Sequence, residues 1–230
     1  MERELPRTGL NGSALVGLLA ELQLAPDNRR ATPPSFVEGM GRWLGWKEAI
    51  PLSAVLQAPL GPAAGVRAPG AHATAALERE FNRVHAALGK AIDDDRSTAR
   101  DDGRDFLPFR RRCFSLQQAM DTAIGPLRTQ LRAAVARLSP QMAQLAALDA
   151  VMANALAPRE QAQLAQMPAL LDKHFTRLRQ ASAESTQDTP WLDTFRQDMR
   201  RLLLAERDLR LQPALGLLET LRGTPQGLHE

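Results

Sequence analysis

The stretch "FLPFRRRCFSLQQAMDTAIGPLRTQLRAAVARL", residues 106–138, decides the fold. Its apolar residues recur at spacings of three and four, which is the period of one face of an α-helix. The stretch therefore predicts a helix of roughly 33 residues, about 50 Å long at a rise of about 1.5 Å per residue. Gly125-Pro126 should kink this helix, because proline lacks an N–H donor and clashes with the preceding turn. The predicted buried stripe consists of Phe106, Phe109, Cys113, Leu116, Met120, Ile124, Leu127, Leu131, Val135 and Leu138.

The segments that follow this helix in the sequence show the same period. Ser139-Pro140 predicts a cap and a first-turn proline for a helix to Leu156, and Ala157-Pro158 starts or kinks another. Thr189-Pro190 opens a last long helix. Aromatic residues make up only 4% of the chain, and leucine and alanine are abundant, which favours helix over sheet. Because long helices joined by short turns fold back as antiparallel neighbours, we expect an all-α fold with a long antiparallel helical bundle and coiled-coil-like packing.

The start of the chain predicts a small N-terminal helical module over residues 8–57. A helix is expected over Gly12–Gln23. Ser35 and Glu38 have the spacing of a capping box, which predicts that a second helix starts at Phe36.

Two segments without apolar periodicity divide the sequence. Residues 58–73 form a Pro/Gly/Ala-rich linker, and the elongated bundle is expected to occupy residues 74–222. Within the bundle, the run "DDDRSTARDDGRD" at 93–105 is typical of a solvated, mobile connector.

Composition limits the compartment and the class of ligand. The single cysteine, Cys113, excludes an internal disulfide framework and fits a reducing compartment. The charged start does not resemble a secretory signal, and no apolar run approaches the length of a membrane span. We expect a cytoplasmic protein. The net charge of +3 is mild, and the excess of arginine over lysine, 26 to 3, is also what a GC-rich coding sequence produces.

The sequence offers few groups for catalysis. No nucleotide-binding, hydrolase or metal-ligating motif occurs, so we expect no catalytic residue, no cofactor and no metal site. His174 flanks an apolar stripe and is interpreted as a packed or half-exposed histidine. Cys113 belongs to the apolar stripe and is interpreted as a core residue.

Clusters of arginines are the one feature of the predicted helices that indicates ligand binding. Converging arginine faces could neutralise several phosphates and bind nucleic acid without sequence preference. The alternative is that they form ordinary solvated faces with i,i+4 pairs such as Glu206–Arg210. The candidate nucleic-acid-binding residues are Arg110, Arg111, Arg112, Arg128, Arg132, Arg196 and Arg200.

Two tryptophans lie close together in a chain that has three tryptophans and no tyrosine. Trp43 and Trp46 flank Gly45, which can end the helix that starts at Phe36. Both indoles fit a structural core, or one of them anchors a partner, since tryptophan is enriched at interface hot spots. Pro51 then falls in the first turn of a short helix or breaks a longer one. The candidate partner-binding residues are Phe36, Trp43 and Trp46.

Four quoted segments carry a family resemblance: "SFVEGMGRWLGWKEAIPLSAVL", "PFRRRCFSLQQAMDTAIGPLRTQLRAAV", "SPQMAQLAALDAVMANALAPREQ" and "FRQDMRRLLLAERDLRLQPALGLLETLR". Together they resemble an uncharacterised bacterial family whose members are similar to an accessory, non-stator component of Zorya type III anti-phage defence systems. The resemblance implies a cytoplasmic partner of a stator-like membrane complex, recruited to the inner membrane through its partners and acting with a second cytoplasmic accessory protein of the same operon. It supplies no catalytic residues.

Three functional hypotheses follow. The leading one is a non-enzymatic interaction or effector subunit of phage defence. The second is a sequence-independent DNA-binding effector that uses the arginine faces, and the third is a structural homo-oligomer.

Overall fold

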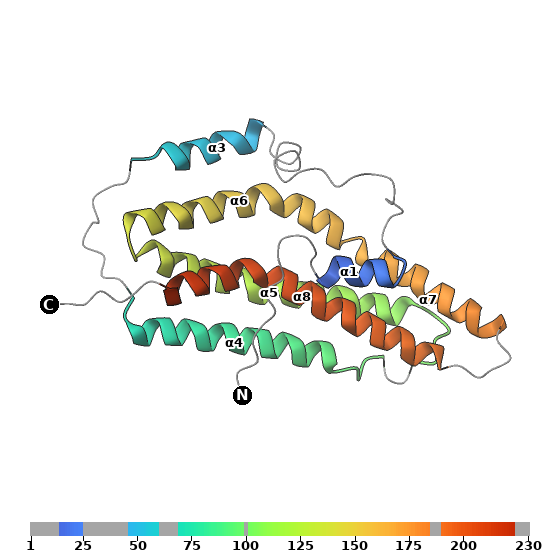
Figure 1. The fold of residues 1–230 in the computed structure, drawn as a ribbon. Helices are drawn as coiled ribbons and strands as arrows, with labels where there is room; N and C mark the ends of the chain where they lie inside the picture. Colours follow the sequence, from blue (N-terminus) through green and yellow to red (C-terminus); the bar gives the residue numbers. More distant parts are fainter. Residues whose placement is uncertain (1–13, 25–45, 60–68, 99–100, 185–189, 224–230) are drawn as a thin grey trace. The chain divides into compact units, whose positions relative to one another are not determined.

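The computed structural model describes residues 14–24, 46–59, 69–98, 101–184 and 190–223. All regular structure within these ranges is α-helical, so the prediction of an all-α helical bundle is confirmed (Figure 1). The described helices are α1 (Ala14–Glu21), α3 (Trp46–Gln57), α4 (Ala71–Asp93), α5 (Leu107–Ala136), α6 (Pro140–Leu164), α7 (Met167–Glu184) and α8 (Trp191–Gly223).

The chain forms two compact units, and each draws on distant parts of the sequence. The first consists of residues 1–29, 86–120 and 166–211, and the second consists of residues 30–85, 121–165 and 212–230. Helices α1 and α7 thus belong to the first unit, and α3 and α6 belong to the second, whereas α4, α5 and α8 contribute a segment to each. The two short helices of the predicted module 8–57 fall into different units.

An aromatic cluster forms the core of the first unit. It holds four of the chain's seven phenylalanines. Phe195 of α8 lies edge-on to Phe109 and Phe175, with ring centroids 5.1 Å apart in both cases. Phe106 lies against the same rings, and Trp191 stands edge-on to Phe175 at 5.2 Å. Because the side chains of Phe109 and Phe195 are fully buried, this cluster is the hydrophobic centre of the unit.

The second unit is built on the continuation of the α5 stripe. The predicted stripe residues Ile124, Leu127, Leu131 and Val135 are buried, as the helical period requires. Leu138, the last predicted stripe residue, lies after the end of α5 and is half-buried. Pro126 lies inside α5 without ending it.

The helix boundaries agree with the sequence where a cap is encoded. Ser139 is the N-cap of α6, its Oγ accepts a hydrogen bond from the Met142 amide at 3.2 Å, and Pro140 occupies the first turn. The predicted end at Leu156 is wrong, because α6 continues through Pro158 to Leu164. Two further boundaries differ: α4 starts at Ala71, within the predicted linker, and α3 contains Pro51 in its interior.

Helix α1 ends in a left-handed cap. Gln23 has a φ of 57°, and the amides of Gln23 and Leu24 donate to the carbonyls of Ala20 and Leu19 at 3.0 and 2.7 Å. This is the Schellman pattern, with glutamine at the position that glycine usually occupies.

Candidate functional site

Helix α3 presents the most exposed apolar side chains among the described residues. Ile50 and Leu56 are 67% and 61% exposed, and the segment 49–57, "AIPLSAVLQ", contains no charged residue. Large exposed apolar patches usually mark interaction sites. The solvent face of α3 is therefore a candidate docking surface, which we call the α3 face and define as Ala49, Ile50, Ser53, Ala54, Leu56 and Gln57.

The opposite side of α3 packs on α6 (Figure 1). The side-chain amide of Gln144 donates to the carbonyls of Val55 and Leu56 at 2.9 and 3.2 Å. These carbonyls belong to the last turn of α3, which has no intrahelical donors for them, so Gln144 caps the helix. Helix α3, which carries the α3 face, is thus fixed on α6 by these hydrogen bonds.

The predicted partner-binding residues lie next to this surface in the sequence. Trp46 is the first residue of α3. Phe36 and Trp43 fall outside the described residues, and their role stays a prediction.

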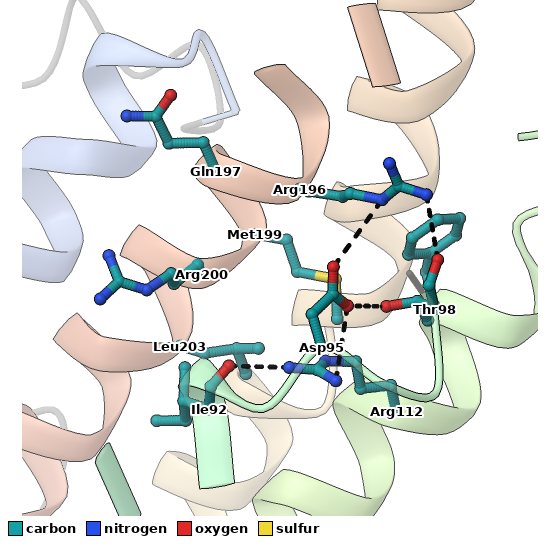
Figure 2. Close-up of a pocket in the computed structure, with 10 residues that line it drawn as sticks. Ile92, Asp95, Thr98, Arg112, Arg196, Gln197, Met199, Arg200 and Leu203 are labelled. Carbon is teal, nitrogen blue, oxygen red and sulfur yellow. Dashed lines mark hydrogen bonds and ion pairs between the residues drawn. The ribbon is translucent and has the colours of Figure 1, made fainter. Parts of the chain in front are cut away.

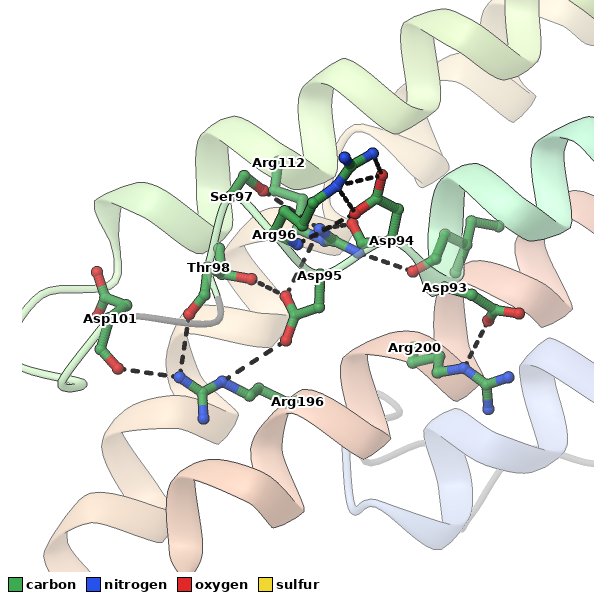
Figure 3. Close-up of polar contacts among 11 residues, drawn as sticks. Asp93, Asp94, Asp95, Arg96, Ser97, Thr98, Asp101, Arg112, Arg196 and Arg200 are labelled. Carbon is green, nitrogen blue, oxygen red and sulfur yellow. Dashed lines mark hydrogen bonds and ion pairs between the residues drawn. The ribbon is translucent and has the colours of Figure 1, made fainter.

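Arg112 has a structural use that its sequence neighbours Arg110 and Arg111 do not share. Its guanidinium donates to the carbonyls of Ile92 and Asp94 and to Ser97 Oγ (Figure 3). The side chain is only 10% exposed, and it lies 3.5 Å from the carboxylate of Asp95. Arg112 therefore binds the backbone at the end of α4.

Arg196 and Arg200 of α8 hold the same connector, residues 93–105, from the other side (Figure 3). One terminal nitrogen of Arg196 donates to the carbonyls of Thr98 and Asp101 at 3.0 and 2.9 Å. Arg200 Nε donates to Asp93 at 2.7 Å.

The expectation of a solvated connector is wrong for two of its described residues, Thr98 and Gly103, and the other described residues are exposed or half-exposed. Thr98 is 1% exposed. Gly103 is also buried, has a φ of +72°, and a Cβ there would meet the Trp191 ring at 2.9 Å, so only glycine fits. Asp94 stays at the surface, where hydrogen bonds from Arg96 lower the pKa of its carboxyl group to about 2. The arginines from α5 and α8 supply the partners that water would otherwise provide.

Arg128 and Arg132 converge on one carboxylate in the second unit. Both guanidiniums bind Asp149 of α6, with closest distances of 2.5 and 2.8 Å. Burial acts to raise the pKa of Asp149, but the hydrogen bonds from the two arginines outweigh it and lower the pKa. The pair of arginines predicted to face phosphates therefore faces an internal carboxylate.

Arg110 and Arg111 are exposed on α5. The Arg110 guanidinium lies over the exposed ring of Phe114, 5.7 Å from its centroid. Of the seven predicted arginines, these two face solvent and form no ion pair with an acidic side chain in the described part of the chain.

His174 is buried in a polar chain across α7 and α8. Its Nε2 lies 2.8 Å from Asp198, and its Nδ1 lies 2.9 Å from an Arg177 nitrogen. Since an arginine can only donate, Nδ1 accepts and Nε2 carries the proton that is donated to Asp198. Arg177 also donates to the Leu22 carbonyl at 2.9 Å. These hydrogen bonds link α1 to α7 and α8 within the first unit, so His174 has a structural role.

Glu206 forms the i,i+4 pair with Arg210 that the alternative interpretation of the arginines names, and it is fully buried. Arg210 binds its carboxylate at 2.8 Å, and the Gln117 amide donates to both oxygens at 3.1 and 3.2 Å. Buried charges need such partners. The sequence signal was present, because Glu206 follows Leu202 by four residues and thus lies in the apolar stripe of α8.

Cys113 is buried, as predicted for a core residue. Burial and the nearby Glu206 charge raise the pKa of its thiol to about 12. Because the thiolate is the reactive form, the buried thiol should be inert.

We expect native Cys113 to react with a maleimide at pH 8 about three orders of magnitude more slowly than the unfolded chain, whose thiol has a pKa of about 8.5. Raising the pH from 8 to 9 should accelerate modification of the folded protein about tenfold and that of the unfolded chain only about threefold, because the unfolded thiol is already partly ionised at pH 8. Mass spectrometry with and without guanidinium measures both rates. Equal rates would contradict the assignment.

A pocket of about 340 Å³ opens in the first unit beside the connector (Figure 2). The Thr98 hydroxyl donates to Asp95, whose carboxylate lies between Arg112 and Arg196, 3.5 and 3.8 Å from their nitrogens. Sequence reasoning did not find this pocket, because its walls come from four separate segments. They are Ile92, Asp95, Thr98, Phe109, Arg112, Arg196, Gln197, Met199, Arg200 and Leu203.

Neither a candidate metal site nor a membrane-spanning helix occurs in the described part of the chain. Its His, Cys, Asp and Glu side chains form no group of three or more that could hold a metal ion. None of its helices combines the length and apolarity that crossing a membrane requires.

A family model described as "Protein of unknown function (DUF3348)" matches residues 1–223. No curated protein and no solved structure matches the chain.

Proposed function

Because the chain belongs to the DUF3348 family, whose function is unknown, we propose its function from its surface and from the resemblance described above. The protein is, in this proposal, a non-enzymatic interaction subunit of an anti-phage defence system. It is cytoplasmic, is recruited to the inner membrane by its partners, and acts with a second accessory protein of its operon and a stator-like membrane complex.

The observation that carries this proposal is the α3 face. Ile50 and Leu56 are more than 60% exposed on a helix whose segment 49–57 has no charge. A rigid helix with exposed aliphatic side chains binds a partner at low entropic cost, because its backbone is already ordered. Trp46 is the first residue of α3 and follows Trp43 by three residues in the sequence, and tryptophan is a frequent hot-spot residue.

The buried polar groups support a role without catalysis. Cys113 has a raised pKa, His174 is paired on both ring nitrogens, and Glu206 is neutralised by Arg210. His174 and Glu206 form contacts between helices, and Cys113 is buried in the core.

Ile50→Ser combined with Leu56→Ser is expected to abolish co-purification with the operon partners and phage protection. Because both side chains are exposed, the free energy of unfolding should change by less than about 0.5 kcal/mol per site. Affinity pull-down from cells that express the whole operon, together with a plaque assay, tests this.

The matched control is Val16→Ser, since Val16 of α1 is 59% exposed. It should leave both readouts unchanged. If the α3 double variant keeps its partners and its protection, the docking proposal fails.

DNA binding is the alternative function, and Arg110 and Arg111 are the residues that favour it. The other five predicted arginines already bind carbonyl or carboxylate oxygens of the protein itself, so a phosphate would compete with these contacts. They are Arg112, Arg128, Arg132, Arg196 and Arg200. If the alternative holds, DNA affinity falls steeply between about 50 and 200 mM salt, and Arg110→Ala with Arg111→Ala flattens that dependence.

A further inference from the structure

One side of α5, in the first unit, carries exposed apolar and basic side chains together. Leu107 and Phe114 are 42% and 46% exposed. Arg110 and Arg111, which lie between them in the sequence, are exposed as well. We call these four residues the α5 face, and we propose that it binds single-stranded nucleic acid, with a base stacked on Phe114 and phosphates on the two arginines.

The helical period brings the four side chains to one side of α5. Residues three, four and seven apart are neighbours on a helix surface, so Leu107, Arg111 and Phe114 follow one another along it. Arg110 stands one turn before Phe114, and its guanidinium carbon lies 5.7 Å from the centroid of that ring. The ring of Phe109 is fully buried in the aromatic core on the other side of the helix. The α5 face is therefore a continuous strip of apolar and cationic groups.

The charge of this strip is positive throughout. Residues 106–120 contain no aspartate or glutamate. Arg112, the third arginine of the run, donates to the carbonyls at the end of α4. Arg110 and Arg111 form no ion pair with an acidic side chain in the described ranges, so they can bind phosphates without breaking one. The complementary ligand is a polyanion.

Phe114 decides which polyanion fits. Exposed aromatic rings beside basic residues stack the bases of single strands, and a planar guanidinium such as that of Arg110 stacks on bases as well. In a duplex, neighbouring base pairs cover the faces of each base, so Phe114 cannot reach them. From Leu107 to Phe114 the helix rises about 10 Å, at about 1.5 Å per residue, which matches roughly three nucleotides at about 3.4 Å each.

This inference rests on the nucleic-acid-binding alternative, which it narrows to single strands, and it does not involve the α3 face. The test is fluorescence anisotropy of the full chain with labelled oligothymidylate and oligouridylate of about 12 nucleotides, and with a DNA duplex of equal length. At about 50 mM salt, a single strand should bind roughly five- to a hundredfold more tightly than the duplex, which is the effect of one stacked base. The tighter of the two single strands identifies DNA or RNA as the ligand.

Two variants separate stacking from charge. Phe114→Leu keeps an apolar side chain but removes the ring, so single-strand affinity should fall roughly five- to a hundredfold while its salt dependence stays unchanged. Arg110→Ala with Arg111→Ala should instead lower the slope of log affinity against log salt by about 1.4, since each phosphate contact on a single strand contributes about 0.7.

The matched controls change an exposed leucine and an exposed arginine elsewhere. Leu145→Ala on α6, where the side chain is 40% exposed, and Arg79→Ala on α4 should leave the affinity unchanged. Equal affinity for single strand and duplex, or wild-type binding by Phe114→Leu, overturns the inference and leaves the duplex-binding alternative standing. Failure of all three nucleic acids to bind overturns both. A polyglutamate peptide that binds as tightly as oligothymidylate also overturns the inference, because the face then fits an acidic protein segment.

Discussion

Glu206→Ala is expected to lower the free energy of unfolding by about 3–5 kcal/mol, because it removes a fully buried carboxylate that pairs with the charge of Arg210. Arg210 is 11% exposed, and one of its nitrogens lies 2.8 Å from a carboxylate oxygen of Glu206. The Gln117 amide loses the two Glu206 oxygens to which it donates in the same step. Chemical denaturation followed by circular dichroism measures the loss.

Two further variants separate the charge effect from a general effect of substitution in α8. Glu206→Leu combined with Arg210→Met removes both charges and should recover most of the stability, since apolar residues of similar volume replace a buried pair at little cost. Glu219→Ala changes an exposed glutamate of the same helix and should stay within about 0.5 kcal/mol of wild type. Equal losses for Glu206→Ala and Glu219→Ala would refute the buried network.

Phe195→Ala is the second change with a large expected effect, a loss of about 3–5 kcal/mol. The fully buried ring contacts Phe106, Phe109 and Phe175, so its removal leaves a cavity where α5, α7 and α8 meet. Thermal and denaturant unfolding measure the effect. Phe114→Ala is the control, because that ring is 46% exposed and should cost less than about 1 kcal/mol. Similar losses at the two positions would contradict the central role of Phe195.

The helices were predictable because their information is local. Apolar residues three and four apart placed the α5 stripe, and Ser139 with Pro140 placed the start of α6, since both signals involve neighbours within one or two turns. Prolines were less informative. Pro51 and Pro158 lie inside helices. Pro51 was expected in the first turn or at a break, and Pro158 at the start or at a kink of a helix.

The polar contacts were not predictable because their partners are distant in the sequence. The run 93–105 has the composition of a solvated segment, and nothing in it indicates that Arg196, some ninety-eight residues after Thr98, binds its carbonyl. The same limit applies to Arg128, whose partner Asp149 lies on the next helix. His174 was recognisable as a flank of an apolar stripe, but its Asp198 partner was not.

The hydrogen bonds from Arg112 and Arg196 to the connector limit which substitutions these two positions tolerate. Each of these guanidiniums reaches several oxygens at once: two carbonyls and a hydroxyl for Arg112, two carbonyls for Arg196. A lysine at either position would preserve the net charge of +3 but would present a single compact ammonium group with a different reach. A genome under selection for AT-rich codons could therefore exchange many of the 26 arginines for lysine, yet these two would resist the exchange.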